Sequence, residues 1–155
     1  KDYLNIVNRV RKKCPDIALS SDFIVGFPGE SRSDFKKTIE LVKEVSFAQA
    51  YSFKYSSRPG TKSSRITSDE ISVEESSDRL HEIQEILNKQ QRVFNNKFLS
   101  KKVEVLVKGK GKKKDQYRGT TKWMQVVNFI SQNPVNSFEK VNLKKISNNS
   151  ISGEV

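Results

Sequence analysis

The order of the expected elements in residues 1–57 constrains the fold more than any other feature of this sequence. Helical spacing predicts a first helix that Pro15 ends, and its apolar residues are Tyr3, Leu4, Ile6, Val7 and Val10. A strand is expected over 17–25, a second helix over 31–45 and a second strand over 48–56. Two strands joined by a helical crossover run parallel, with a right-handed connection. The first part of the chain is therefore predicted to be α/β.

The second helix carries the clearest local signals. Ser31 or Ser33 can cap its start, and Asp34 suits its first turn. An apolar stripe follows at helical spacing, formed by Phe35, Ile39, Val42 and Val45. Two parallel strands alone leave faces that need cover. Since the chain also starts without Met, we expect the last part of a larger α/β sheet or barrel within a longer protein.

The pattern changes in the second half. A long helix is predicted over 73–98, with apolar markers Leu80, Ile83, Leu87, Phe94 and Phe98, and it could bridge two domains. Short strands are expected after Lys102, over 103–109, 117–130, 138–147 and 150–155. They predict a small all-β module resembling an OB-like barrel. The predicted fold class is thus α/β followed by all-β, with domains at 1–100 and 101–155.

Charge is distributed unevenly along the chain. The net charge is +11, and residues 101–155 hold twelve Lys and Arg against four Asp and Glu. A basic C-terminal module of this kind favours a polyanionic partner, most plausibly nucleic acid, although a merely basic surface is the alternative. No run approaches a membrane span, and the start has no apolar signal region. The single cysteine, Cys14, fits a reducing compartment and cannot by itself hold a metal or an iron–sulfur cluster.

The end of the first expected strand is a candidate ligand site, because α/β proteins bind ligands at the carboxyl ends of their strands. Alternation places Ser20, Asp22 and Ile24 on one face, where Asp22 could accept hydrogen bonds and Ile24 could contact a flat ring. Gly26 and Gly29 allow positive φ and close backbone approach. By local pattern alone the alternative is favoured, in which Asp22 is a buried structural acid and the glycines only shape a turn.

The second expected strand alternates between aromatic and polar residues. Tyr51, Phe53 and Tyr55 share one face, and Ser52 and Lys54 share the other. Alternation does not decide which set faces inward. Aromatic residues in such a pattern are more often core than part of a cofactor site.

Lysines gather at one expected hairpin of the β module. The candidate RNA-binding residues are Lys108, Lys110, Lys112, Lys113, Lys114, Arg118, Lys122 and Trp123, with the last three placed on the next strand. Lysines attract phosphates without reading sequence. Trp123 could stack on an unpaired base or belong to the core, and the core is favoured. His81 is expected to have only a surface or packing role, and no Ser/His/Asp or Cys/His arrangement for nucleophilic catalysis is present.

Three segments resemble the C-terminal half of the tRNA methylthiotransferases, which are radical S-adenosylmethionine (SAM) enzymes. They are ALSSDFIVGFPGES, AYSFKYSSRPGT and GTTKWMQVVNF, in this order and spacing. The stretch KWMQVVNF points to the members that act on isopentenyladenosine in tRNA rather than to those that act on ribosomal protein or threonylcarbamoyl-adenosine.

The resemblance implies the end of a TIM-like radical-SAM barrel followed by a TRAM domain that binds RNA. It implies methylthiolation of C2 of the adenosine in the tRNA anticodon loop, with SAM and two 4Fe–4S clusters as cofactors. It also implies a cytoplasmic enzyme, not bound to a membrane, with a flavodoxin or ferredoxin as electron donor. The residues implied to contact SAM are Ser20, Asp22, Ile24, Gly26 and Tyr55.

The chain departs from the family pattern in two ways. Ile24 and Gly26 fit the Gly-x-Ile-x-Gly-x-x-Glu pattern beside the adenine of SAM, but Asp22 replaces its first glycine and Glu30 comes one residue late. The cysteines of the clusters are not in this chain, so it is expected to be inactive alone. The alternatives are a non-catalytic RNA-binding module and an unrelated phosphate-binding α/β barrel.

Overall fold

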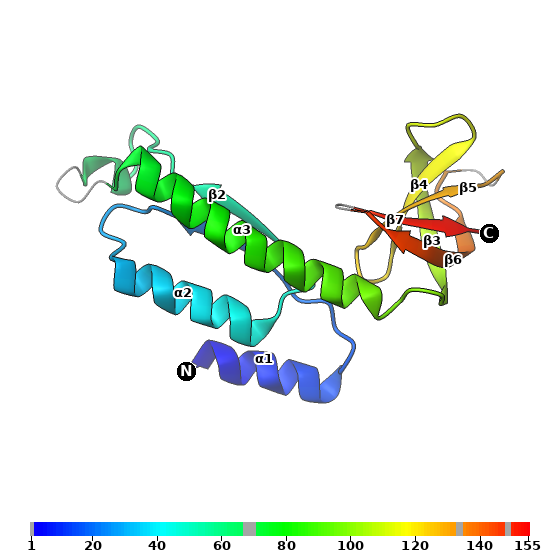
Figure 1. Ribbon diagram of the computed structural model, residues 1–155, viewed down its shortest axis with the longest axis horizontal. Helices are drawn as coiled ribbons and strands as arrows, with labels where there is room; N and C mark the ends of the chain where they lie inside the picture. Colours follow the sequence, from blue (N-terminus) through cyan, green and yellow to red (C-terminus); the bar gives the residue numbers. More distant parts are fainter. Residues whose placement is uncertain (1, 67–70, 133–134, 148–149) are drawn as a thin grey trace. The chain divides into compact units, whose positions relative to one another are not determined.

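The computed structural model describes residues 2–66, 71–132, 135–147 and 150–155. The chain divides into two compact units, a first unit of Lys1–Gln90 and a second unit of Gln91–Val155. The division falls within the long helix α3, Val73–Asn96 (Figure 1). The predicted long helix is therefore confirmed.

In its described residues, the first unit contains two α-helices, one short 3-10 helix, two strands and most of α3. In chain order its other elements are α1 (Asp2–Lys13), β1 (Ser20–Val25), α2 (Arg32–Val45), β2 (Gln49–Lys54) and the short 3-10 helix η1 (Ser63–Arg65). The strands β1 and β2 pair in parallel, as predicted, with Asp22 opposite Tyr51 and Ile24 opposite Phe53. Both strands are shorter than the sequence pattern indicated.

Helix α2 forms where its local signals predict it. The Ser31 hydroxyl accepts a hydrogen bond from the backbone N–H of Asp34 at 3.1 Å, so Ser31 rather than Ser33 is the N-cap. The helix ends at Ser46, whose φ of +51° is left-handed. The predicted stripe is confirmed, because its four apolar residues are all buried.

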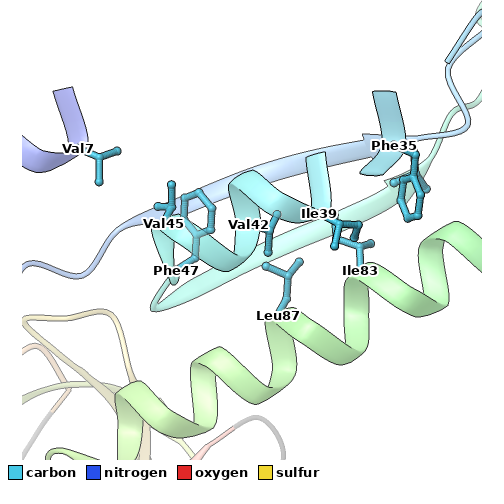
Figure 2. Close-up of a cluster of buried hydrophobic side chains, with 9 residues drawn as sticks. Val7, Phe35, Ile39, Val42, Val45, Phe47, Ile83 and Leu87 are labelled. Carbon is cyan, nitrogen blue, oxygen red and sulfur yellow. The ribbon is translucent and has the colours of Figure 1, made fainter. Parts of the chain in front are cut away.

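The core of the first unit lies between its helices and one face of the sheet. In Figure 2, Ile83 and Leu87 of α3 point toward Ile39 and Val42 of α2. Val25 of β1 joins the same core, and α1 contributes Val7. Burying one such side chain contributes about 1.5–3 kcal/mol, so packing rather than helix propensity holds these elements together.

The second unit is a closed five-stranded barrel. Its strands are β3 (Lys102–Lys110), β4 (Gln116–Thr121), β5 (Val126–Ile130), β6 (Phe138–Ile146) and β7 (Ile151–Glu154), in the spatial order β3-β4-β5-β7-β6. Only the contact between β5 and β7 is parallel. The predicted small all-β module is confirmed. Its core holds inward-facing residues of the strands together with Phe98 and the flanking Phe94 of α3.

The prediction of one strand over 117–130 is wrong. The segment forms two antiparallel strands, β4 and β5, joined by a tight turn at residues 122–125. Thr121 N–H donates to the Gln125 carbonyl at 3.0 Å, and Met124 N–H donates to the Thr121 carbonyl at 3.0 Å. Lys122 and Trp123 therefore lie in this turn and not on a strand. The sequence hid the turn because residues 122–125 contain no Gly, Pro, Asn or Asp.

Candidate functional sites: the open sheet face and the basic hairpin

The face of the β1–β2 sheet that lies away from the helices is open. Ser20, Asp22 and Ile24 lie on it, so the prediction that they share one face is confirmed. Ile24 is 58% exposed, and its neighbours Tyr51 and Phe53 are 56% and 54% exposed. The structure thus decides the orientation that alternation left open, and it places Tyr51 and Phe53 on the open face. Asp22 is exposed, so its interpretation as a buried structural acid is wrong. These side chains are exposed because the helices cover only the other face of the sheet.

A pocket of about 560 Å³ lies at the carboxyl ends of the two strands. Ile24, Phe27, Phe53, Tyr55 and Arg58 are among the residues that line it. The rings of Phe27 and Tyr55 meet edge to face, with their centroids 5.0 Å apart. The pocket is mainly apolar, and two cationic residues, Lys54 and Arg58, also line it.

The Tyr55 hydroxyl is the most unusual group beside this pocket. It is buried, and it has no hydrogen-bond partner within the described residues. A buried unpaired hydroxyl costs about 1–3 kcal/mol. The structure thus brings Ile24 and Tyr55 together, while Ser20 and Asp22 lie earlier on the same face.

Gly26 ends β1 in a position that only glycine fits. Its φ is +71°, and a Cβ built there would lie 2.5 Å from the Ser76 hydroxyl of α3. Its backbone N–H donates to the Glu30 carboxylate at 2.7 Å. Gly26 is buried, and its contacts explain the glycine by packing alone.

Arg79 of α3, which is not among the predicted site residues, holds this turn in place. Its Nη1 donates to Glu30 Oε2 at 2.7 Å and to the Glu30 carbonyl at 2.8 Å, while its Nε donates to Glu75 at 3.1 Å. The guanidinium also lies 5.4 Å from the centre of the Phe35 ring. Arg79 is only 6% exposed. A usable signal existed, because Arg79 precedes the buried Ile83 by four residues on one helix face.

Burial by itself would lower the pKa of Arg79. The hydrogen bonds and negative charges of Glu30 and Glu75 outweigh it, and the pKa of Arg79 is raised. The guanidinium is therefore charged at neutral pH. Glu30 is occupied by Arg79 and Gly26, which gives it a structural role in this turn.

In the second unit, the predicted basic residues gather on the β3–β4 hairpin and the turn that follows β4. All seven Lys and Arg of the predicted set are exposed. Six of the seven, all except Lys114, line one of two hollows. The polar hollow, of about 590 Å³, is lined by Lys110, Lys112, Lys113, Arg118, Asn128 and Ser152, among others. The apolar hollow, of about 560 Å³, includes Lys108, Lys122, Trp123, Met124 and Phe138.

Trp123 is half-buried and packs on the barrel core. The centroid of its ring lies 4.1 Å from the centroid of the Phe98 ring. The Lys122 ammonium lies 4.5 Å from the centroid of the Trp123 ring. The prediction of a core contact is confirmed, and stacking on a base stays a prediction.

Met124 and Phe138 were missed. Phe138 could have been found, since it alternates along β6 with Lys140 and Asn142 and so shares their outward face.

Among the described residues, neither the cysteine nor the histidine belongs to a group that could hold a metal ion. The described residues contain no group of three His, Cys, Asp or Glu that could hold a metal ion. Cys14 is exposed, and the exposed His81 lies 3.3 Å from Glu85 one turn along α3. Among the described helices, none is both long enough and apolar enough to cross a membrane.

Comparison with known proteins finds close similarity to one group of synthases. No family model matches the chain. The chain is 48% identical over 141 residues to the tRNA-2-methylthio-N(6)-dimethylallyladenosine synthase of Ehrlichia ruminantium (strain Welgevonden), which covers 91% of the chain. It is 42% identical over 154 residues, or 99% of the chain, to the synthase of that name from Zymomonas mobilis subsp. mobilis. The chain is thus a relative of the tRNA methylthiotransferases, as the sequence predicted.

The likeness covers only part of these relatives. The chain spans 32% of the Ehrlichia ruminantium synthase and 34% of the Zymomonas synthase, in their C-terminal part. A third methylthiotransferase of the same name, from Ehrlichia canis (strain Jake), is 42% identical over the whole chain, which spans 36% of it.

Proposed function

We propose that this chain is the C-terminal part of an enzyme that methylthiolates C2 of an N6-isopentenylated adenosine in the tRNA anticodon loop. The observation that carries the proposal is the identity of 42–48% over most or all of the chain to synthases whose name states this product. In this proposal the first unit is the end of a TIM-like radical-SAM barrel. The second unit is a TRAM domain with an OB-like fold.

The residues of the open sheet face fit SAM. Ile24 and Phe53 offer apolar contact to a flat adenine, and the unpartnered Tyr55 hydroxyl offers a hydrogen bond. Ser20 and Asp22, exposed on the same face, would bind ribose or amine groups. Gly26 would act indirectly, by allowing the turn that ends β1. When bound, SAM supplies a methyl group and the 5′-deoxyadenosyl radical, and these residues would bind and orient it.

The residues of this chain do not fit an iron–sulfur cluster. A cluster of this class needs three cysteines, and the chain has one, which is exposed. The proposal therefore assigns both 4Fe–4S clusters, and the docking of a flavodoxin or ferredoxin, to other parts of a longer cytoplasmic enzyme.

A chimaera tests the proposed function. The C-terminal part of the Zymomonas synthase is replaced by this chain, and the chimaera is expressed in a host that lacks the modification. Nucleosides of the host tRNA are then measured by mass spectrometry. We expect the methylthiolated nucleoside, with the intact Zymomonas synthase as positive control.

A soluble chimaera that contains its clusters but leaves only the isopentenylated nucleoside would contradict the proposal. Binding of tRNA without modification would then favour the non-catalytic RNA-binding module. Replacing Tyr55 by Phe in the chimaera should raise the KM for SAM, because it removes only the hydroxyl that lacks a partner.

A further inference from the structure

The apolar hollow of the barrel displays side chains that the fold does not need. The register places Leu106 of β3 opposite Phe138 of β6 and opposite Thr120 of β4, on the outer surface of the barrel. Phe138 is 63% exposed, whereas the inward-facing Val105 and Val107 are fully buried. Phe138 thus contributes little to the core, although it is a large apolar residue.

Met124 is held in an unfavourable backbone conformation beside Phe138 in the same hollow. Its φ is +63°, in the left-handed region that costs a residue other than glycine on the order of 1 kcal/mol. Its side chain is 62% exposed, so burial does not offset that cost. Glycine or asparagine would suit the turn better. Local strain without a packing gain is typical of a residue kept for a contact with a partner.

Side-chain hydrogen bonds hold the turn that carries Met124. The Thr121 hydroxyl donates to the Gln125 side-chain oxygen at 3.0 Å and accepts from the Trp123 N–H at 3.2 Å. The Gln125 amide donates to the buried Asn95 side chain at 2.9 Å. These bonds fix the positions of Trp123 and Met124 before any partner arrives, which lowers the entropy cost of binding.

The charges around the apolar hollow favour RNA over a protein partner. Three lysines line it, Lys102, Lys108 and Lys122, against the single carboxylate of Glu104. The ion pairs found within the described part of the barrel include none to these lysines. A duplex would satisfy the lysines with phosphates, but its base faces are already stacked and could not fill an apolar hollow. An unpaired base flanked by phosphates matches both features.

We propose that the apolar hollow binds one unpaired base against Trp123, Met124 and Phe138, while the polar hollow on the same hairpin binds backbone phosphates. The module then selects RNA with a single-stranded segment, such as a loop, over a continuous duplex. This inference rests on the proposed function of the second unit in binding tRNA and names the part of the RNA that it recognises.

The chain's single tryptophan gives a direct test with the full 155-residue chain. Two RNA probes are titrated at one salt concentration: an anticodon stem–loop, and the same stem closed as a blunt duplex without a loop. We expect the stem–loop to quench Trp123 fluorescence and to bind at least five-fold more tightly, as one stacked base would provide. Equal affinities with no fluorescence change would overturn the proposal.

Variants separate base binding from folding. Phe138→Ala should weaken stem–loop binding about five-fold or more and leave duplex binding unchanged. Met124→Gly should also weaken stem–loop binding, yet it should not lower the thermal midpoint, because glycine accepts the positive φ. The matched control is Ile130→Ala, since Ile130 is 70% exposed on β5 and lies outside the residues that line the hollow.

Two other results carry different meanings. Stem–loop affinity that is indifferent to Phe138→Ala and Met124→Gly, but sensitive to salt, would overturn base binding and leave the RNA-binding role of the lysines intact. Failure of both probes to bind at low salt would contradict both the RNA-binding role of the module and this inference. In that case the apolar hollow would have to be covered by protein.

Discussion

Arg79 Nη1 and Glu30 Oε2 lie 2.7 Å apart, and their side chains are only 7% and 12% exposed. The pair joins the turn after β1 to a helix 49 residues further along the chain. The same carboxylate oxygen accepts the Gly26 N–H, so one atom fixes both the end of the strand and the helix beside it. The turn that borders the proposed SAM pocket is therefore held from behind by α3.

Replacing Arg79 by Leu should destabilise the first unit by about 3–5 kcal/mol, because it leaves the Glu30 carboxylate buried without its cation. Urea unfolding followed by circular dichroism measures the loss, and amide exchange at Gly26 should accelerate with it. Arg32→Leu is the matched control. Arg32 pairs with Glu75 at 3.6 Å but is 80% exposed, so its loss should have little effect. Equal stabilities for the two variants would contradict the structural role of the Arg79–Glu30 pair.

Replacing Gly26 by Ala should cost about 2–5 kcal/mol, since a Cβ at φ +71° is strained and also clashes with the Ser76 hydroxyl. Adding Ser76→Ala to this variant should recover the part of the lost stability that is due to the clash with the hydroxyl. Gly29→Ala provides the control, because Gly29 has a φ of +84° but nothing within 4 Å of its Cβ position. Gly29→Ala should lose only the stability that backbone strain at positive φ removes, about 1–2 kcal/mol. Thermal unfolding of the three variants tests this ranking.

The start of α2 should be sensitive to acid. The Ser31 hydroxyl and then Lys37 stabilise the Asp34 carboxylate and hold the pKa of Asp34 below its ordinary value of 3.8. A lowered pKa in the folded state stabilises the protein above pH 3.8, and this contribution disappears as the pH falls through the lower folded value. NMR titration of the Asp34 carboxyl measures the shift.

Ser31→Ala should move the pKa of Asp34 back toward 3.8 and remove the N-cap, at a cost of about 1 kcal/mol. Ser33→Ala is the control, because Ser33 is exposed and does not cap the helix. An Asp34 pKa that is the same in both variants would contradict the assigned cause.

Binding of tRNA by the chain should depend steeply on salt. If the basic hairpin makes roughly four to six phosphate contacts, log K should fall with log[salt] with a slope of about −3 to −5. Replacing Lys112, Lys113 and Lys114 by Ala should flatten the slope by roughly two to three units, with little dependence on RNA sequence. Fluorescence anisotropy over a salt series measures both. The control replaces the exposed Lys12, Lys13 and Lys36 of the first unit, which should leave the slope unchanged.

The sequence by itself determined the elements whose signals are local. The Ser31 cap and the Phe35–Val45 stripe of α2 lie within one segment, and a parallel pairing of β1 with β2 follows from the helix that connects them. The basic hairpin was also predictable, because exposed lysines need no partner to stay in water. The resemblance read from three segments agrees with the similarity of nearly the whole chain to the Zymomonas synthase.

Only the tertiary structure decided which face of the sheet is covered. The strands alternate in the same way whether helices lie above or below them, so exposure of Asp22 and Phe53 could not be read from alternation. The break between β4 and β5 is of the same kind, because long-range barrel closure and hydrogen bonds force Met124 into a turn against its intrinsic preference. The Arg79–Glu30 pair joins residues 49 apart, and its energy exists only once packing has removed both charges from water.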